Sequence, residues 1–113
     1  KATVALADDL LNMVRQFDPS LELKYNKFYI GLSRDGQPFN FVSFRPKKNN
    51  INFELKLPEA EEIDAKIESA EIEALEYNKR WGLYRLRLTK EQIKGSTETL
   101  KELMQLAYER RAS

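Results

Sequence analysis

The stretch from Phe28 to Leu57, FYIGLSRDGQPFNFVSFRPKKNNINFELKL, decides the fold of this chain. It contains three runs rich in aromatic and β-branched residues, which suit a half-buried pleated surface. Two turn signals, Asp35-Gly36 and Asn49-Asn50, separate the runs. The third run, INFELKL at residues 51–57, alternates apolar and polar residues, so one side of it faces a core and the other faces water. We therefore expect an antiparallel meander over residues 28–57.

The segments on either side predict the rest of a single α+β domain over residues 1–113. Apolar residues recur at helical spacing over residues 6–17 and 100–107, which predicts an N-terminal helix and a C-terminal helix packed on the sheet. Pro58 and the glutamates that follow it predict an acidic helix, because proline and acidic residues both favour a first helical turn. Residues 21–25 and 81–88 alternate as strands. We expect an antiparallel sheet of about four or five strands, with the meander 28–57 and strand 81–88 as its main parts.

The composition excludes several kinds of site. With 113 residues, 42% of them hydrophobic, the chain is long enough to bury one core. It contains no cysteine and no histidine, which excludes disulfides, thiolate zinc sites and nucleophiles activated by histidine. No apolar run approaches the length of a membrane span, so we expect a cytoplasmic protein that does not enter membranes. The chain begins at Lys1 rather than methionine, and we expect a domain excised from the C-terminus of a larger protein.

The net charge is only +1, but the charges are unevenly distributed. Residues 24–56 hold seven basic residues against two acidic ones, and residues 79–94 hold six against one. Between these blocks, residues 59–76 hold eight acidic residues against Lys66 alone. Such blocks could form a basic face and an acidic face, each suited to a partner of opposite charge. They could also compensate one another within the fold, and the sequence leaves both interpretations open.

One constellation has the pattern of a catalytic site. Glu54-Leu55-Lys56 on the third run, with Asp35 upstream, is the arrangement in which restriction-type nucleases hold Mg²⁺ with two carboxylates and orient a water with lysine. With 13 Glu and 11 Lys in the chain, a Glu-x-Lys triplet is expected by chance, and Glu22-Leu23-Lys24 repeats it. Asp35 also stands in an Arg-Asp-Gly turn, where aspartate has a structural use. A solvent-facing pair of Glu54 and Lys56 is the interpretation that we favour.

A second constellation is basic and aromatic. Lysines and arginines beside exposed aromatic rings suit a phosphate backbone with occasional base stacking. The candidate nucleic-acid-binding residues are Arg45, Lys47, Lys48, Lys79, Arg80, Arg85 and Arg87. Aromatic residues on strands are more often core than platform, so we predict that Phe41, Phe44 and Trp81 are buried. The acidic segment 59–76 has no calcium-loop spacing, and we expect neither a metal site nor a cofactor.

Several segments together resemble an uncharacterised bacterial family. The match is carried by Asn40-Phe41-Val42-Ser43-Phe44-Arg45-Pro46-Lys47-Lys48 and by Leu103-Met104-Gln105-Leu106-Ala107-Tyr108, with the Trp81-Gly82 pair between them. That family is a small α+β domain of unknown function, found alone or appended to restriction-type and defence-associated proteins. The chain is also similar, more distantly, to the double-wing (MmcQ/YjbR-like) α+β group, whose members are thought to bind DNA. The resemblance implies an accessory role beside a catalytic domain and assigns no catalytic residues.

These observations lead to one leading expectation and two alternatives. The leading expectation is a non-catalytic accessory module that binds nucleic acid through a basic face. The first alternative is a Mg²⁺-dependent nuclease that uses Asp35, Glu54 and Lys56. The second is a protein-interaction module whose acidic face, residues 59–76, docks on a basic partner.

Overall fold

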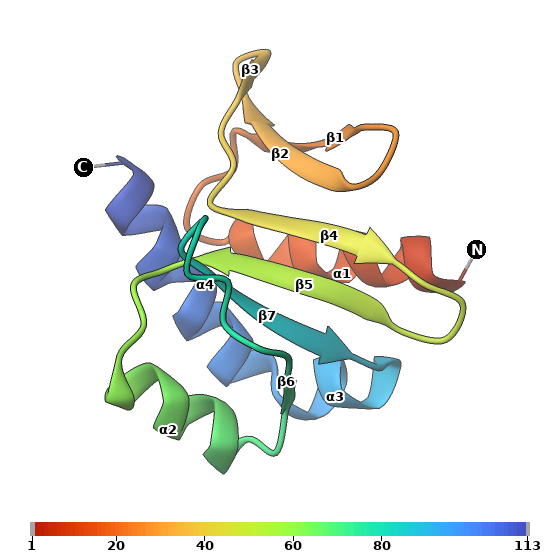
Figure 1. Ribbon diagram of the computed structural model, residues 1–113. Coiled ribbons are helices and arrows are strands. Elements are labelled where there is room, and N and C mark those ends of the chain that lie inside the picture. Colours follow the sequence, from red (N-terminus) through yellow and green to blue (C-terminus); the bar gives the residue numbers. More distant parts are fainter. Residues whose placement is uncertain (1, 113) are drawn as a thin grey trace.

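The computed structural model describes residues 2–112 and consists of one antiparallel sheet with helices on one of its faces (Figure 1). Among these residues, no helix combines the length and the apolar character needed to cross a membrane. The elements, in chain order, are α1 (Ala2–Val14), β1 (Leu21–Tyr25), β2 (Ile30–Arg34), β3 (Gln37–Pro38), β4 (Val42–Pro46), β5 (Ile51–Lys56), α2 (Glu61–Ser69), β6 (Glu73–Ala74), β7 (Leu83–Leu88), α3 (Lys90–Gly95) and α4 (Thr97–Ala112).

The sheet has seven strands, and every neighbouring pair is antiparallel. The spatial order is β1-β2-β4-β5-β7-β6, and β3 pairs with β2 beside this path. The fold class is confirmed, but the expected number of strands is too low. The strands β3 and β6 are each two residues long, which is too short for an alternating pattern to be recognised in the sequence.

The strand register separates the residues of the sheet into an apolar face and a polar face. On the apolar face, Phe44, Phe53 and Leu86 stand opposite one another across β4, β5 and β7, and all three are fully buried. On the polar face, the same strands bring Ser43, Glu54 and Arg85 into one row and Arg45, Asn52 and Arg87 into the next. Alternation within each strand therefore becomes a two-sided sheet, as the run at residues 51–57 predicts.

Helices α1, α3 and α4 pack against the apolar face (Figure 1). In α4, the predicted stripe is confirmed, because Leu100, Leu103, Met104 and Ala107 are all buried. The acidic helix α2 packs beside α4 and β6 through Ile63 and Ile67. Within residues 2–112, no helix covers the polar face of β4, β5 and β7, which we call the open face.

Phe41 and Phe44 are buried as predicted, but the prediction for Trp81 is wrong. Its side chain is 56% exposed. The strand β7 begins at Leu83, two residues later than the alternating pattern indicates, so Trp81 lies in the preceding turn. In that turn, the backbone N–H of Trp81 donates a hydrogen bond to the Asn78 side chain at 3.0 Å, which fixes the indole outside the core.

A polar clamp joins the connection between α1 and β1 to α4. The Tyr108 hydroxyl of α4 donates to Oδ2 of Asp18 at 2.7 Å, and the Ser20 hydroxyl donates to Oδ1 at 2.6 Å. Burial alone would raise the pKa of the Asp18 carboxyl, but the hydrogen bonds from Ser20 and Tyr108 outweigh it and hold this pKa below its ordinary value. The hydrogen bond to Asp18, helped by burial, raises the pKa of Tyr108. The ring of Tyr108 packs against Phe17 and Phe41.

Candidate functional site

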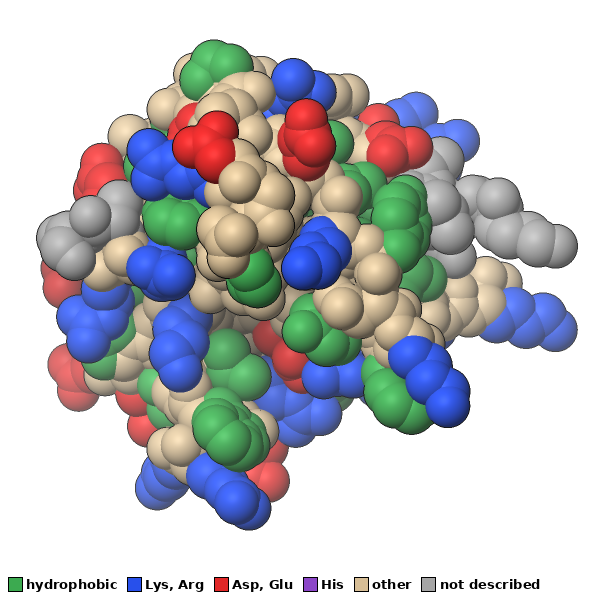
Figure 2. All heavy atoms as spheres, turned by 90° about the horizontal axis from the view of Figure 1, so that it is seen from above, with side chains coloured by type: hydrophobic (Ala, Val, Ile, Leu, Met, Phe, Trp, Pro, Cys, Tyr) green, Lys and Arg blue, Asp and Glu red, His purple; other side chains and the backbone are tan. Residues whose placement is uncertain are grey.

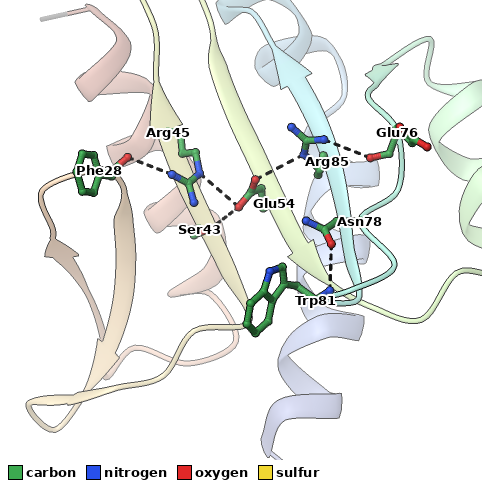
Figure 3. A network of polar contacts seen from close by, with 8 residues as sticks. All are labelled: Phe28, Ser43, Arg45, Glu54, Glu76, Asn78, Trp81 and Arg85. Atoms are coloured by element: carbon green, nitrogen blue, oxygen red, sulfur yellow. Dashed lines mark hydrogen bonds and ion pairs between the residues drawn. The ribbon is translucent and has the colours of Figure 1, made fainter.

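A row of polar groups crosses the open face from the β1–β2 turn to the segment after β6 (Figure 3). The guanidinium of Arg45 donates to the Phe28 carbonyl at 3.5 Å and lies 3.5 Å from Oε1 of Glu54. From the other side, Arg85 lies 3.7 Å from Oε2 of Glu54 and donates to the Glu76 carbonyl at 3.5 Å. Five chain segments therefore meet along one line through the middle of the face.

Glu54 is the centre of this row. Its side chain is only 12% exposed, and the Ser43 hydroxyl also donates to it, at 3.4 Å. A carboxylate so enclosed is expensive to leave without partners, and the guanidiniums of Arg45 and Arg85 supply them. The two ion pairs are long, and both arginine side chains remain more than one third exposed. One carboxylate thus holds two arginines in place while leaving them accessible to a ligand.

A cleft of about 560 Å³ opens on this face beside the row. We call it the sheet cleft. Its floor includes Ser43 and Glu54, and its walls include Tyr29, Asn40 and Trp81. From above, Figure 2 shows a hollow in which acidic and basic side chains meet, with hydrophobic side chains at its margin.

At one end of the open face, Trp81 stands among basic residues. The Lys56 ammonium donates to the Trp81 carbonyl at 2.8 Å, and the Arg80 guanidinium lies 5.2 Å from the centre of the indole ring. A smaller hollow of about 260 Å³ continues from this end, sharing Asn40 and Lys56 with the sheet cleft. It is also lined by Arg110 and Arg111 of α4. This end therefore combines an exposed aromatic ring with several cations.

The opposite end of the sheet also carries an exposed aromatic residue beside cations; the carbonyl of Phe28 faces Arg45, and its ring points away from the central row (Figure 3). Phe28, in the β1–β2 turn, is 73% exposed, and the Lys27 ammonium lies 5.4 Å from the centre of its ring. The β4–β5 turn lies at the same end of the sheet (Figure 1) and carries Lys47 and Lys48, both exposed. Arg45 connects this end to the central row and lies 5.5 Å from the centre of the Tyr29 ring.

The structure brings some of the candidate nucleic-acid-binding residues together and separates others. Arg45 and Arg85 meet at Glu54, and Arg87 stands on the same face, where it forms an ion pair with Glu73 at 3.0 Å. The four remaining candidates lie at the two ends of the same strands: Lys47 and Lys48 at one end, Lys79 and Arg80 at the other. The two basic segments of the sequence thus lie on the same face of the sheet, but at different positions along it.

The three residues of the nuclease alternative are not gathered into one site. Asp35 is exposed in the two-residue turn between β2 and β3, where it and Gly36 have φ values of 53° and 79°. Such positive φ values are typical of a type I′ hairpin turn, which is a structural use of aspartate-glycine. Asp35 does not line the sheet cleft, whereas Glu54 and Lys56 do. The polar contacts of Glu54 are with Ser43 and the two arginines.

Within residues 2–112, no three acidic side chains come together in a geometry that could hold a metal ion. The donor set around Glu54 consists of two guanidiniums and a hydroxyl, which suits an anion more than a cation. The guanidiniums of Arg45 and Arg85 can therefore bind negatively charged or planar groups at the open face.

Tyr29, Asn40 and Phe28 were not among the candidate residues, although the first two line the sheet cleft. For Phe28 the sequence contains a signal, since Asn26-Lys27 before it is typical of a turn, and a turn residue points away from a core. For Asn40 the sequence contains no such signal. Its Oδ1 accepts the Leu32 N–H at 2.8 Å, a contact that depends on the folding of the β3–β4 connection over β2.

A second groove, of about 370 Å³, lies between α2 and the β6–β7 segment. Its floor contains Ile67 and Tyr84, and Glu59, Asp64 and Glu68 stand around it. Burial raises the pKa of Tyr84 to about 12, and the nearby Asp64 carboxylate, which accepts the tyrosine hydroxyl at 2.9 Å, adds to the rise. This acidic groove lies on the segment 59–76.

The fold and the open face define a small α+β domain with helices on one side of its sheet and a polar face on the other. Residues 1–111 match the family described as Domain of unknown function (DUF5655), and the chain belongs to that family. The expectation of an uncharacterised family of small domains is thereby confirmed. No curated protein and no solved structure shows a significant match to the chain.

Proposed function

We propose that this domain is a non-catalytic accessory module that binds nucleic acid through the open face of its sheet. The observation that carries the proposal is the combination of a face without helices and a cleft lined by Arg45 and Lys56, with Arg85 beside it at Glu54. Binding faces of proteins are seldom covered by their own helices, and an uncovered sheet face with basic side chains is complementary to a phosphate backbone.

The binding energy in this proposal comes mainly from cations that have no acidic partner in the fold. Lys47, Lys48 and Lys79 make no ion pair within residues 2–112, so their charge is available to phosphates. Each phosphate that a lysine neutralises releases condensed counterions, and the affinity therefore falls as salt rises. With about three to five such contacts, we expect dissociation constants in the micromolar range or weaker at low salt, with little dependence on sequence.

The biological setting of the proposal follows the resemblance described above. A domain without its own catalytic constellation, beside a nuclease or another defence enzyme, supplies affinity for the substrate of its neighbour. The more distant similarity to the double-wing α+β group, with its DNA-binding members, agrees with this role. Affinity that is weak in isolation is sufficient there, because tethering raises the effective concentration of the second site.

The test is a titration of labelled single-stranded and duplex oligonucleotides at two salt concentrations, with and without Mg²⁺. Replacing Lys47 and Lys48 with alanine removes two exposed cations and should lower the slope of log affinity against log salt by up to about 1.4 for single strands. The matched control replaces Lys90 and Lys94, two exposed lysines of α3 in the helix layer, and should leave affinity and slope unchanged.

The comparison of titrations with and without Mg²⁺ distinguishes this proposal from the nuclease alternative. Cleavage that requires Mg²⁺ and disappears in Glu54→Ala or Lys56→Ala would replace the proposed function with that alternative. Equal effects of the Lys47/Lys48 and Lys90/Lys94 changes would show that the charge of the whole domain, rather than the open face, attracts the ligand.

The acidic groove favours a second candidate function, docking of a basic protein segment. Its apolar floor and the carboxylates of Glu59, Asp64 and Glu68 suit a lysine or arginine side chain with its long apolar stem. Absence of binding to both oligonucleotide forms at low salt, together with binding of an arginine-rich peptide, would establish this function in place of the first.

A further inference from the structure

We infer that the ligand of the open face is an unpaired nucleic-acid strand, whose bases stack on two separate aromatic platforms, Trp81 and Phe28. The inference rests on the proposed function and specifies its ligand. The proposed function requires only phosphate contacts, which a duplex also offers, whereas stacking requires base faces that a duplex hides.

Exposure is the first argument for the platforms. The large hydrophobic side chains that are exposed in residues 6–111 are Tyr25, Phe28 and Trp81. Trp81 and Phe28 each have a cation near the ring, Arg80 at 5.2 Å and Lys27 at 5.4 Å. A ring with one face in water and a cation beside it offers both a stacking surface for a base and a charge for the adjoining phosphate.

Position is the second argument, because the two platforms stand at opposite ends of the sheet: Trp81 precedes β7 and Phe28 precedes β2, with β4 and β5 between these two strands. The register pairs Lys56 with Leu83 near Trp81, and Ile51 with Leu88 at the other end. These positions are five residues apart, which is about 17 Å along the strands at roughly 3.3 Å per residue, and three strand spacings of about 4.8 Å each separate β2 from β7 across the sheet. One base stacked on each ring would therefore leave the intervening part of the strand above the centre of the open face.

The groups between the platforms suit the backbone of that intervening strand. Arg45 and Arg85 form ion pairs with Glu54 and stay partly exposed. Lys56 donates a hydrogen bond to the Trp81 carbonyl and so lies next to this platform. The sheet cleft of about 560 Å³, with Tyr29 and Asn40 in its walls, lies along the same path. The arrangement is thus aromatic, cationic, aromatic, in the order in which an extended single strand would meet it.

The intrinsic fluorescence of the protein tests the first platform directly, because Trp81 is the only tryptophan in the chain. Its emission should be that of an exposed indole and should be quenched when a single-stranded decanucleotide is added. The same sequence as a duplex should quench it much less. A dinucleotide, which at about 3.4 Å per stacked nucleotide cannot reach both rings, should bind far more weakly than the decanucleotide.

Substitutions test both platforms without disturbing the core, since both side chains are exposed. Trp81→Leu and Phe28→Leu should each weaken decanucleotide binding by about 5- to 100-fold, whereas Trp81→Phe should retain most of the affinity. The control is Tyr25→Leu, which removes an exposed ring from the same hairpin. The register pairs Tyr25 with Ile30, on the opposite face of the sheet, so this change should leave affinity unchanged.

The outcomes separate this inference from the proposed function on which it rests. Equal affinity for duplex and single strand, or unchanged affinity in Trp81→Leu and Phe28→Leu while the Lys47/Lys48 change still weakens binding, would overturn the inference and leave the proposed function standing. Failure of every oligonucleotide to bind would overturn both. Loss of affinity in Tyr25→Leu equal to that in Phe28→Leu would show that the hairpin as a whole, not the platform, matters.

Discussion

Removing the hydroxyl of Tyr108 should destabilise the domain measurably while leaving its packing intact. In Tyr108→Phe the ring stays among Phe17, Phe39 and Phe41, and only the 2.7 Å hydrogen bond to Asp18 is lost. Hydrogen bonds to charged groups contribute about 1.5–3 kcal/mol. Because Asp18 keeps its two hydrogen bonds from Ser20, the loss should lie near the lower end, at about 1.5–2 kcal/mol.

The pH dependence of this loss follows from the lowered pKa of Asp18. The unfolded chain, with a pKa of about 3.9, binds more protons than the folded protein just below that value, so stability falls as the pH falls. The contribution of the clamp is fully present above the unfolded pKa and is lost as the pH drops through the folded pKa. The difference in stability between wild type and Tyr108→Phe should therefore shrink as the pH is lowered from about 6 to below 4.

Urea unfolding followed by circular dichroism over this pH range measures both effects. Tyr25→Phe is the control, because its hydroxyl is exposed and makes no hydrogen bond within the described residues. A Tyr108→Phe protein as stable as wild type near neutral pH would refute the argument. A stability difference that stays constant down to acidic pH would show that the hydroxyl acts through packing rather than through the carboxylate.

Two further changes test the core and the wall of the sheet cleft. Leu103→Ala should cost roughly 2–5 kcal/mol of unfolding free energy, since Leu103 is fully buried, and an unfolding midpoint equal to wild type would contradict this packing. Gly31→Ala should cost about 1–3 kcal/mol, because a Cβ there would stand 2.5 Å from the Asn40 oxygen that accepts the Leu32 N–H. Gly95→Ala, where a Cβ meets no atom within 4 Å, is the control, and equal thermal unfolding of both alanine variants would refute the clash.

Much of the fold could be predicted because its main elements are long and regular. Alternation in β5 and β7 identifies their buried faces, and the helical spacing of apolar residues over 100–107 identifies the buried stripe of α4. The burial of Trp81 was predicted incorrectly because aromatic residues on strands are usually core, whereas Trp81 lies in the turn before β7. Periodicity describes which side of a strand a residue takes, and it does not show where the strand begins.

The candidate site was less predictable, because it depends on which strands are neighbours. The separate alternation of β5 and β7 places Glu54 and Arg85 on polar faces. Only the pairing of these strands brings the two side chains within 3.7 Å. Phe28 and Trp81 are exposed in turns at opposite ends of the sheet, and no local pattern links residues 53 positions apart. Register and topology, rather than composition, therefore determine what the open face can bind.

The position of α4 after all the strands of the sheet has a consequence for how the domain folds during synthesis. Leu100, Leu103, Met104 and Ala107 cover the apolar side of the sheet, and the Asp18–Tyr108 hydrogen bond spans 90 positions of sequence. A ribosome releases α4 after all the strands of the sheet, so part of the apolar side of these strands stays bare in the growing chain until α4 emerges. Folding must then close its longest loop in one late step, and a nascent chain that stalls before α4 is the form most exposed to chaperones and to aggregation.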